Sequence, residues 1–288
     1  MTSQRRAAAA LLWTLCLAVT PACDTPASDT TTTEPAQIPS AAAPPDLATT
    51  SSAPALPPAQ GAPSPADASN ANADGWEIIG SSTQGRPIRL RSLGRGPRKV
   101  LFVGGIHGDE PEGAHTTAVL PEAFTAAGLA DRVTLTIVED ANPDGRALGT
   151  RGNANSVDIN RNFPASNFDA SDPANGGTPL SQAESRVLFD TIERVAPDLI
   201  ISMHSWSGRQ FINFDGPAHE LAQRFAQTSG IPAQESSSFA ATPGSVGSFV
   251  GRDGGTALLT VEVLKGADPV AVWNELKTAL IQAIGGDV

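Results

Sequence analysis

Two histidines and a glutamate stand just beyond apolar runs of the sequence, and side chains of these types can hold a metal ion. The segment 99–113 passes from an apolar run through a glycine pair to His107 and Glu110. Three positions make nearly one helical turn, so both side chains can face one point. A second apolar run, 199–203, leads directly into His204. Two imidazoles and one carboxylate would complete a catalytic zinc site with a position left open for water.

The competing interpretation is that these histidines are ordinary core residues. A single His-x-x-Glu pair is a weak signal, and a lone histidine is more often a buried residue with a satisfied hydrogen bond. The chain contains only four histidines, however, and two of them follow strand-like runs, which favours the metal site. His115 and His219 fall within expected helices, and we expect both to be structural or surface residues.

Glu262 is a carboxylate inside the otherwise apolar run 257–264. A buried charge is costly unless it is paired, protonated or functional. One interpretation is a structural salt bridge. The other is a general base beside a metal-bound water, because loss of solvent would raise its basicity toward the working pH.

The interval 139–179 is rich in Asn, Asp, Gly and Pro and is long for a loop in a compact domain. It carries Arg151, Asp158, Asn160 and Arg161. Guanidinium groups bind carboxylates through paired hydrogen bonds and stabilise developing oxyanions. The alternative is a solvated loop in which Asp158 pairs with a nearby arginine.

The elements that must position these residues alternate between strand and helix. Apolar runs predict strands at 99–103, 133–138, 199–203 and 257–264. Helical stretches lie at 112–127, 181–195, 217–229 and 268–284, with Ser181 and Asp268 as expected N-caps and Gly285 as a stop signal. This alternation predicts the α/β class: a single three-layer α/β/α domain around a mostly parallel, mixed sheet. Ligands of such folds bind beyond the carboxyl ends of the strands.

The first part of the chain does not resemble a folded domain. Residues 1–22 combine Arg5 and Arg6 with an apolar run, which predicts an export signal. Residues 23–74 are rich in Ala, Pro, Ser and Thr, and they predict a disordered tether that can be lipid-anchored at Cys23. Simple cleavage of the signal would instead release the protein. The catalytic domain is expected at 75–288.

Composition limits the partners. The formal net charge is −11, and the expected tether contributes acidic residues but no basic ones. A moderately acidic domain without a basic stripe argues against nucleic acid. We expect an exported monomer of the cell envelope that touches the membrane only through a lipid anchor.

Taken together, the residues resemble the zinc carboxypeptidase family, including its short bacterial members such as murein peptide amidases. The resemblance runs from about residue 75 to the C-terminus, with the motif stretches in family order. It implies zinc binding by His107, Glu110 and His204, polarisation of the scissile carbonyl by Arg151, binding of the substrate carboxylate by Asn160 and Arg161, and general base catalysis by Glu262. Asp158 would orient its neighbours rather than react.

Two features depart from the family pattern. The chain has no tyrosine, whereas well-known carboxypeptidases close a mobile tyrosine over the substrate, and Trp206 stands where a tyrosine commonly follows the third ligand. The family residue that selects the substrate side chain falls near 244–251, a glycine-rich stretch in which no specificity group can be assigned from sequence.

The sequence therefore predicts a zinc-dependent hydrolase that cleaves an amide bond next to a free carboxylate, with peptidoglycan stem peptides or muropeptides as substrates. One alternative is a zinc-dependent deacylase of N-acyl amino acids, which shares the His-Gly-x-Glu start. Another is a non-catalytic envelope-binding lipoprotein, which predicts a broken set of site residues.

Overall fold

The computed structural model of the chain describes residues 75–238 and 241–286. These residues form an eight-stranded mixed sheet in the order β1-β2-β4-β3-β5-β8-β6-β7. The strands are β1 (Glu77–Ser81), β2 (Pro87–Gly94), β3 (Arg98–Val103), β4 (Val133–Val138), β5 (Leu199–Trp206), β6 (Phe211–Asp215), β7 (Ala233–Glu235) and β8 (Ala257–Leu264). The helices are α1 (Glu112–Ala126), α2 (Pro143–Leu148), α3 (Ala183–Val195), α4 (His219–Ser229) and α5 (Pro269–Gly285). The expected segments 1–22 and 23–74 lie outside the described residues.

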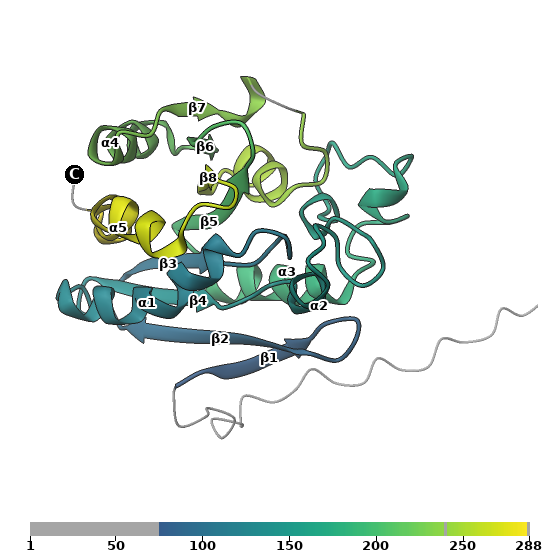
Figure 1. Ribbon diagram of the computed structural model, residues 1–288, viewed down its shortest axis with the longest axis horizontal. Coiled ribbons are helices and arrows are strands. Elements are labelled where there is room, and N and C mark those ends of the chain that lie inside the picture. The colour runs from purple at the N-terminus through teal and green to yellow at the C-terminus, as the bar shows by residue number, and fades with distance from the viewer. Residues whose placement is uncertain (1–74, 239–240, 287–288) are drawn as a thin grey trace, which may run out of the picture. The chain divides into compact units, whose positions relative to one another are not determined.

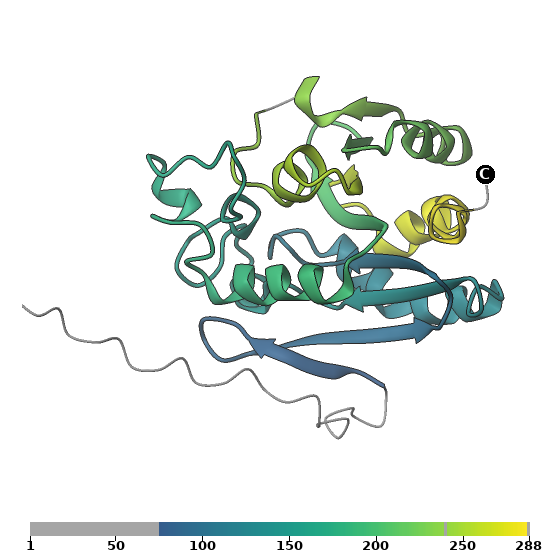
Figure 2. The ribbon, with the colours of Figure 1, turned by 180° about the vertical axis from the view of Figure 1, so that it is seen from behind.

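Helices cover both faces of the sheet, as expected for the α/β class. Helices α1, α4 and α5 lie on one face and α3 lies on the other (Figures 1 and 2). One buried cluster includes Phe124 of α1 and Trp273 of α5. The other includes Leu188 of α3. Among the described residues, no helix combines the length and apolar character needed to cross a bilayer.

The parallel centre of the sheet follows from its apolar runs. β3 pairs in parallel with β4 and β5, and β5 pairs in parallel with β8. Strands covered on both faces read as continuous apolar sequence, which is why these four were predictable. The outer pairs β1·β2, β2·β4 and β6·β8 are antiparallel, so the sheet is mixed.

The helix boundaries differ from the expected ones by one or two residues, notably at the start of α3 and the end of α5. Helix α3 begins at Ala183 with Gln182 as its N-cap, and Ser181 instead accepts a hydrogen bond from Asn162 Nδ2, so the expected Ser181 cap was wrong. Asp268 does cap α5, where it accepts from the amides of the first turn. Gly285 belongs to that helix, and the left-handed stop is the next residue, Gly286.

Candidate active site

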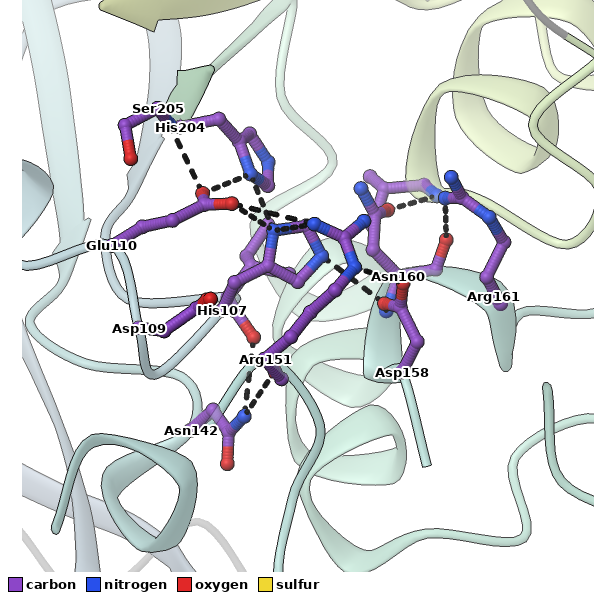
Figure 3. A network of polar contacts seen from close by, with 12 residues as sticks. His107, Asp109, Glu110, Asn142, Arg151, Asp158, Asn160, Arg161, His204 and Ser205 are labelled. Carbon is purple, nitrogen blue, oxygen red and sulfur yellow. Dashed lines mark hydrogen bonds and ion pairs between the residues drawn. The ribbon is translucent and has the colours of Figure 1, made fainter. Parts of the chain in front are cut away.

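Three hydrogen-bond acceptors converge at the carboxyl ends of β3 and β5 (Figure 3). Nδ1 of His107 lies 3.0 Å from Oε1 of Glu110 and 3.0 Å from Nδ1 of His204. Oε2 of Glu110 lies 3.0 Å from the same His204 nitrogen. All three side chains are buried. The structure thus brings together the three residues expected to bind metal.

A glycine turn delivers His107 to this position. Gly105 follows β3 with a φ of 68°, in the left-handed region that glycine adopts without strain. A Cβ at Gly105 would also collide with the side chain of Asp140. The turn therefore requires glycine for its conformation and for its space, and it places the imidazole two residues beyond the turn.

The donor set suits a zinc ion. Nε2 of His107 faces Oδ1 of Asp158 at 3.1 Å, so Nε2 carries the proton and Nδ1 presents its lone pair to the cluster. Acceptors facing each other across 3.0 Å repel unless a positive charge sits between them. Tetrahedral zinc with nitrogen ligands separates those ligands by roughly 3.3 Å, close to the spacing observed. His107, Glu110 and His204 therefore fit this metal.

The pKa shifts indicate the same preference for positive charge. Burial would raise the pKa of Glu110, but the short contacts with the imidazoles of His107 and His204 outweigh it and hold the pKa well below its usual range. Burial would lower the pKa of His107, but the charge of Asp158 outweighs it and raises the pKa. In the described part of the chain, His107, Glu110 and His204 are the one group of three such side chains that could hold a metal.

Glu262 lies beside this cluster without a partner. It is the register neighbour of His204 across the parallel pair β5·β8, and it lines the same cavity. Among the described residues it makes no hydrogen bond or ion pair, so the structure shows no structural salt bridge. Burial raises its pKa, although the charge of His204 acts in the opposite direction. An unpaired, partly desolvated carboxylate is suited to taking up a proton.

The arginines expected to contact the substrate line the same cavity. Arg151 donates from Nε to Oδ2 of Asp158 at 2.9 Å and from Nη1 toward Oε1 of Glu110 at 3.4 Å. Asp158 is thus paired with an arginine, as one sequence interpretation held, but the carboxylate is buried and the arginine lines the cavity. Arg161 donates from Nη1 to the carbonyl of Asn160 at 2.7 Å. Burial lowers the pKa of Arg161, while the charge of Asp158 raises it.

Buried polar residues fix the segment that carries these arginines. Asn142 donates from Nδ2 to the carbonyls of Ile106 and Arg151, at 3.3 Å in each case. Asn153 donates to the buried carboxylate of Glu184 at 2.9 Å. The segment 139–179 contains α2 and two short 3-10 turns, η1 (Ile159–Arg161) and η2 (Pro173–Asn175). It is therefore an ordered wall rather than a solvated loop.

A cavity of about 160 Å³ joins these parts. It is lined by all seven residues singled out in the sequence, namely His107, Glu110, Arg151, Asn160, Arg161, His204 and Glu262. Sequence reasoning missed further polar lining residues, which include Ser202, Asn213, Asp215, Ser236, Ser245 and Thr260. His115 and His219 do not line it. Trp206 stands at its edge with its side chain substantially exposed.

Comparison with known proteins identifies relatives of this chain. A family model described as zinc carboxypeptidase matches residues 72–249. Murein peptide amidase A of Escherichia coli (strain K12) is 31% identical over 192 residues, covering 61% of this chain and 76% of that protein. The crystal structure of murein-tripeptide amidase MpaA from Escherichia coli O157 superposes with a TM-score of 0.60 and 28% identity over 73% of this chain and 92% of that one. Carboxypeptidase A from Helicoverpa armigera shares the fold, with a TM-score of 0.61 at 18% identity over 74% of this chain and 69% of that one.

Proposed function

Because the chain belongs to the zinc carboxypeptidase family of hydrolytic enzymes, we propose that it hydrolyses an amide bond next to a free carboxylate in peptidoglycan stem peptides. One observation carries this proposal. A single cavity is lined by three converging metal-type acceptors, an unpaired carboxylate and two arginines. Those are the groups that metal-assisted amide hydrolysis needs.

His107, Glu110 and His204 would hold the zinc ion. When bound, zinc supplies Lewis-acid polarisation of the scissile carbonyl and makes water more acidic. The protein contributes the geometry of the site. The backbone amide of Ser205 donates to Oε2 of Glu110 at 3.1 Å, and Asp158 orients the His107 ring. Hydrogen bonds to neighbouring groups therefore fix the orientation of two of the three proposed ligands.

Glu262 would move the proton. As general base it takes a proton from the water that attacks the carbonyl carbon, and as general acid it returns that proton to the leaving nitrogen when the C–N bond breaks. Its lack of a partner keeps the carboxylate available for both steps. Its raised pKa makes it a better base than an ordinary glutamate.

The two arginines would stabilise and orient the substrate. Two nitrogens of Arg151 are used by the wall, and Nη2 has no partner among the described residues, so it can donate to the carbonyl oxygen as negative charge develops there. Arg161, with Asn160, would hold the free carboxylate of the substrate by charge-assisted hydrogen bonds.

The substrate class rests on similarity and on the N-terminal sequence. The chain is 31% identical to a murein peptide amidase, and residues 1–22 have the pattern of an export signal. We therefore propose that the enzyme acts in the cell envelope, either lipid-anchored at Cys23 or released by cleavage. Labelling cells with a lipid precursor tests the anchor, and absence of label from the intact protein would contradict it.

The deciding experiment is digestion of purified muropeptides with mass-spectrometric identification of the products. The zinc-loaded enzyme should cleave an amide bond beside a residue with a free carboxylate. A panel of N-acylated amino acids runs in parallel, because a deacylase would release their acyl groups. Glu262→Gln is the matched control for contaminating activity.

If the acylated amino acids are cleaved while the muropeptides stay intact, the proposed substrate is overturned and the deacylase is favoured. Cleavage of neither panel, by a protein with stoichiometric zinc, would contradict the peptidase assignment itself.

A further inference from the structure

The sheet holds the three strands of the site together only as far as their last paired residues. β3 pairs with β5 up to Val103 and Ser202. β5 and β8 stay paired beyond that point, up to Trp206 and Leu264. The proposed zinc ligand Glu110 lies in the segment after β3, past the end of the first ladder. Among the described residues, no strand pairing therefore fixes this segment against the ends of β5 and β8.

Two side chains bridge this gap. Oε1 of Glu112 accepts a hydrogen bond from the backbone amide of Gly266 at 2.7 Å. Oδ2 of Asp109 faces Nζ of Lys265 at 2.5 Å. Lys265 and Gly266 come directly after β8, the strand that carries Glu262. Because β5 lies between β3 and β8 in the sheet, the two contacts join the segment after β3 to the segment after β8 across the end of β5. We call this pair of contacts the clamp.

Both ends of the clamp lead to groups of the proposed site. On one side, Glu110 lies between Asp109 and Glu112 in the sequence. On the other side, the amide of Lys265 donates to the carbonyl of Trp206 at 3.0 Å, so the segment after β8 is held to the strand that carries His204. The clamp therefore sets where Glu110 lies relative to the rest of the site.

Glu112 is the buried member of the clamp. The residue is 1% exposed, and its Oε2 is buried with no hydrogen-bond partner among the described residues. A buried carboxylate with a single hydrogen bond costs stability, although the positive end of α1 offsets part of that cost. Helix α1 has no side-chain N-cap, so no cap fixes its first turn. An incompletely paired buried group beside a reaction site indicates a role in the placement of that site.

We propose that Asp109 and Glu112 are positioning residues, which hold the segment carrying Glu110 to the end of β8 and so fix the proposed zinc ligands relative to one another. The inference rests on the proposed function and adds two residues that touch neither zinc nor substrate. Groups that hold metal ligands in place change metal affinity or activity by about tenfold to a hundredfold. Without the clamp, Glu110 can move away from His204, and zinc should dissociate faster.

The test measures how fast zinc leaves the folded protein into an excess of chelator, with no substrate present. Glu112→Ala removes the acceptor for the Gly266 amide, so the release rate should rise by roughly tenfold. Glu112→Gln keeps an acceptor oxygen and should release zinc at nearly the wild-type rate. A merely structural contact would lower the thermal midpoint of Glu112→Ala without changing zinc release from the folded protein.

Lys265 provides a second variant that does not depend on a buried side chain. Its side chain is 39% exposed, so Lys265→Met should fold even if Glu112→Ala does not. The release rate should rise by roughly twofold to fivefold, the scale of a partly exposed ion pair. Lys265→Arg restores a cation for Asp109 and should restore slow release. Lys277→Met, at an exposed lysine of α5, is the matched control and should change nothing.

Turnover of muropeptides supplies the kinetic comparison. In zinc-loaded Glu112→Ala, kcat should fall by roughly tenfold, because the reacting groups are misplaced. KM should stay near the wild-type value, because the residues proposed to bind the substrate carboxylate, Asn160 and Arg161, lie in another segment. Glu112→Gln should recover the wild-type kcat.

The outcomes separate this inference from the proposed function. If the wild type hydrolyses no substrate, but zinc release is faster in Glu112→Ala and Lys265→Met and slow again in the two conservative variants, the proposed function fails while this inference stands. If muropeptides are cleaved but both folded variants release zinc at the wild-type rate, the inference is overturned and the proposed function stands. Conservative variants that release zinc as fast as the disruptive ones, or a rise in KM with unchanged kcat, overturn it as well.

Discussion

Oδ1 of Asp158 lies 3.1 Å from Nε2 of His107, on the side of the imidazole that faces away from the three-residue cluster. The same carboxylate accepts from Nε of Arg151 at 2.9 Å through Oδ2. One side chain therefore orients a proposed zinc ligand and a proposed oxyanion donor together (Figure 3). Burial of Asp158 keeps solvent from competing for these two contacts.

The first prediction concerns Asp158 as a positioning residue. Asp158→Asn keeps the shape but removes the charge that fixes the His107 tautomer, so we expect zinc affinity to fall by about tenfold to a hundredfold. Competition with a chelator of known affinity measures this. Asp131→Asn is the control, because Asp131 belongs to an exposed ion pair that contributes little. Unchanged zinc affinity in Asp158→Asn would refute the orienting role.

The second prediction tests the metal ligands. His204→Ala removes one of the converging acceptors, so the purified variant should lose most of its zinc and nearly all activity. Elemental analysis of protein dialysed against buffer gives the metal content. His115→Ala serves as the matched control, since His115 lies in α1 outside the cavity and should retain stoichiometric zinc. A His204→Ala variant with full zinc content would show that His204 is not a ligand.

The third prediction concerns Glu262 and pH in zinc-free protein. Its folded-state pKa is raised above the ordinary value of 4.5, so the folded state binds the proton more tightly than the unfolded state does. The stability of the wild type should then rise as pH falls through the raised pKa and level off below 4.5. Glu262→Gln lacks this dependence and should be the more stable protein at neutral pH.

Thermal midpoints of the two zinc-free proteins between pH 4 and pH 8 measure this difference, on the order of a few degrees for a domain of this size. With zinc restored, the same variant should lose turnover by roughly a hundredfold or more while keeping its metal. Parallel midpoint curves would contradict the raised pKa, and normal turnover would overturn the role of Glu262 as base.

The fourth prediction tests Arg161 by a double comparison. If Arg161 holds the substrate carboxylate, Arg161→Ala should raise KM for a peptide with a free terminal carboxylate by about tenfold or more. Amidating that carboxylate should impair the wild type far more than the variant, because an interaction already removed cannot be lost again. Arg95→Ala, at an exposed arginine, is the control. Additive effects of the mutation and the amidation would rule out the contact.

The sequence by itself located the candidate metal-binding residues and the centre of the sheet. Four of the five residues of strand β5 that precede His204 are apolar. A strand covered on both faces is recognisable from such a run in its own sequence. Ligands placed at the ends of parallel strands must share one edge of the sheet. The sequence therefore predicted that His107 and His204 lie close together, and the structure places their Nδ1 atoms 3.0 Å apart.

The hairpin β1·β2 and the strands β6 and β7 were not predicted. β2 alternates buried Ile88 and Leu90 with more exposed residues, a pattern of period two that is weaker than a continuous apolar run. β7 has only three residues. Such outer strands are defined by their pairing partners rather than by their own composition, so sequence periodicity reveals them poorly.

Only the tertiary structure assigned Asp215 to the lining of the cavity. In the sequence, Asp215 is followed by Gly216 and Pro217, which is typical of a turn and indicates no site. The antiparallel register of β6 against β8 sets Asp215 opposite Leu258, and the π-helical turn η4 (Gly247–Asp253) places Gly247 against its carboxylate. These contacts join segments far apart in the chain. Local sequence indicates which residues are buried, but it does not indicate which strands become neighbours. The pairing of β6 with β8 places Asp215 in the cavity lining, although its local sequence is typical of a turn.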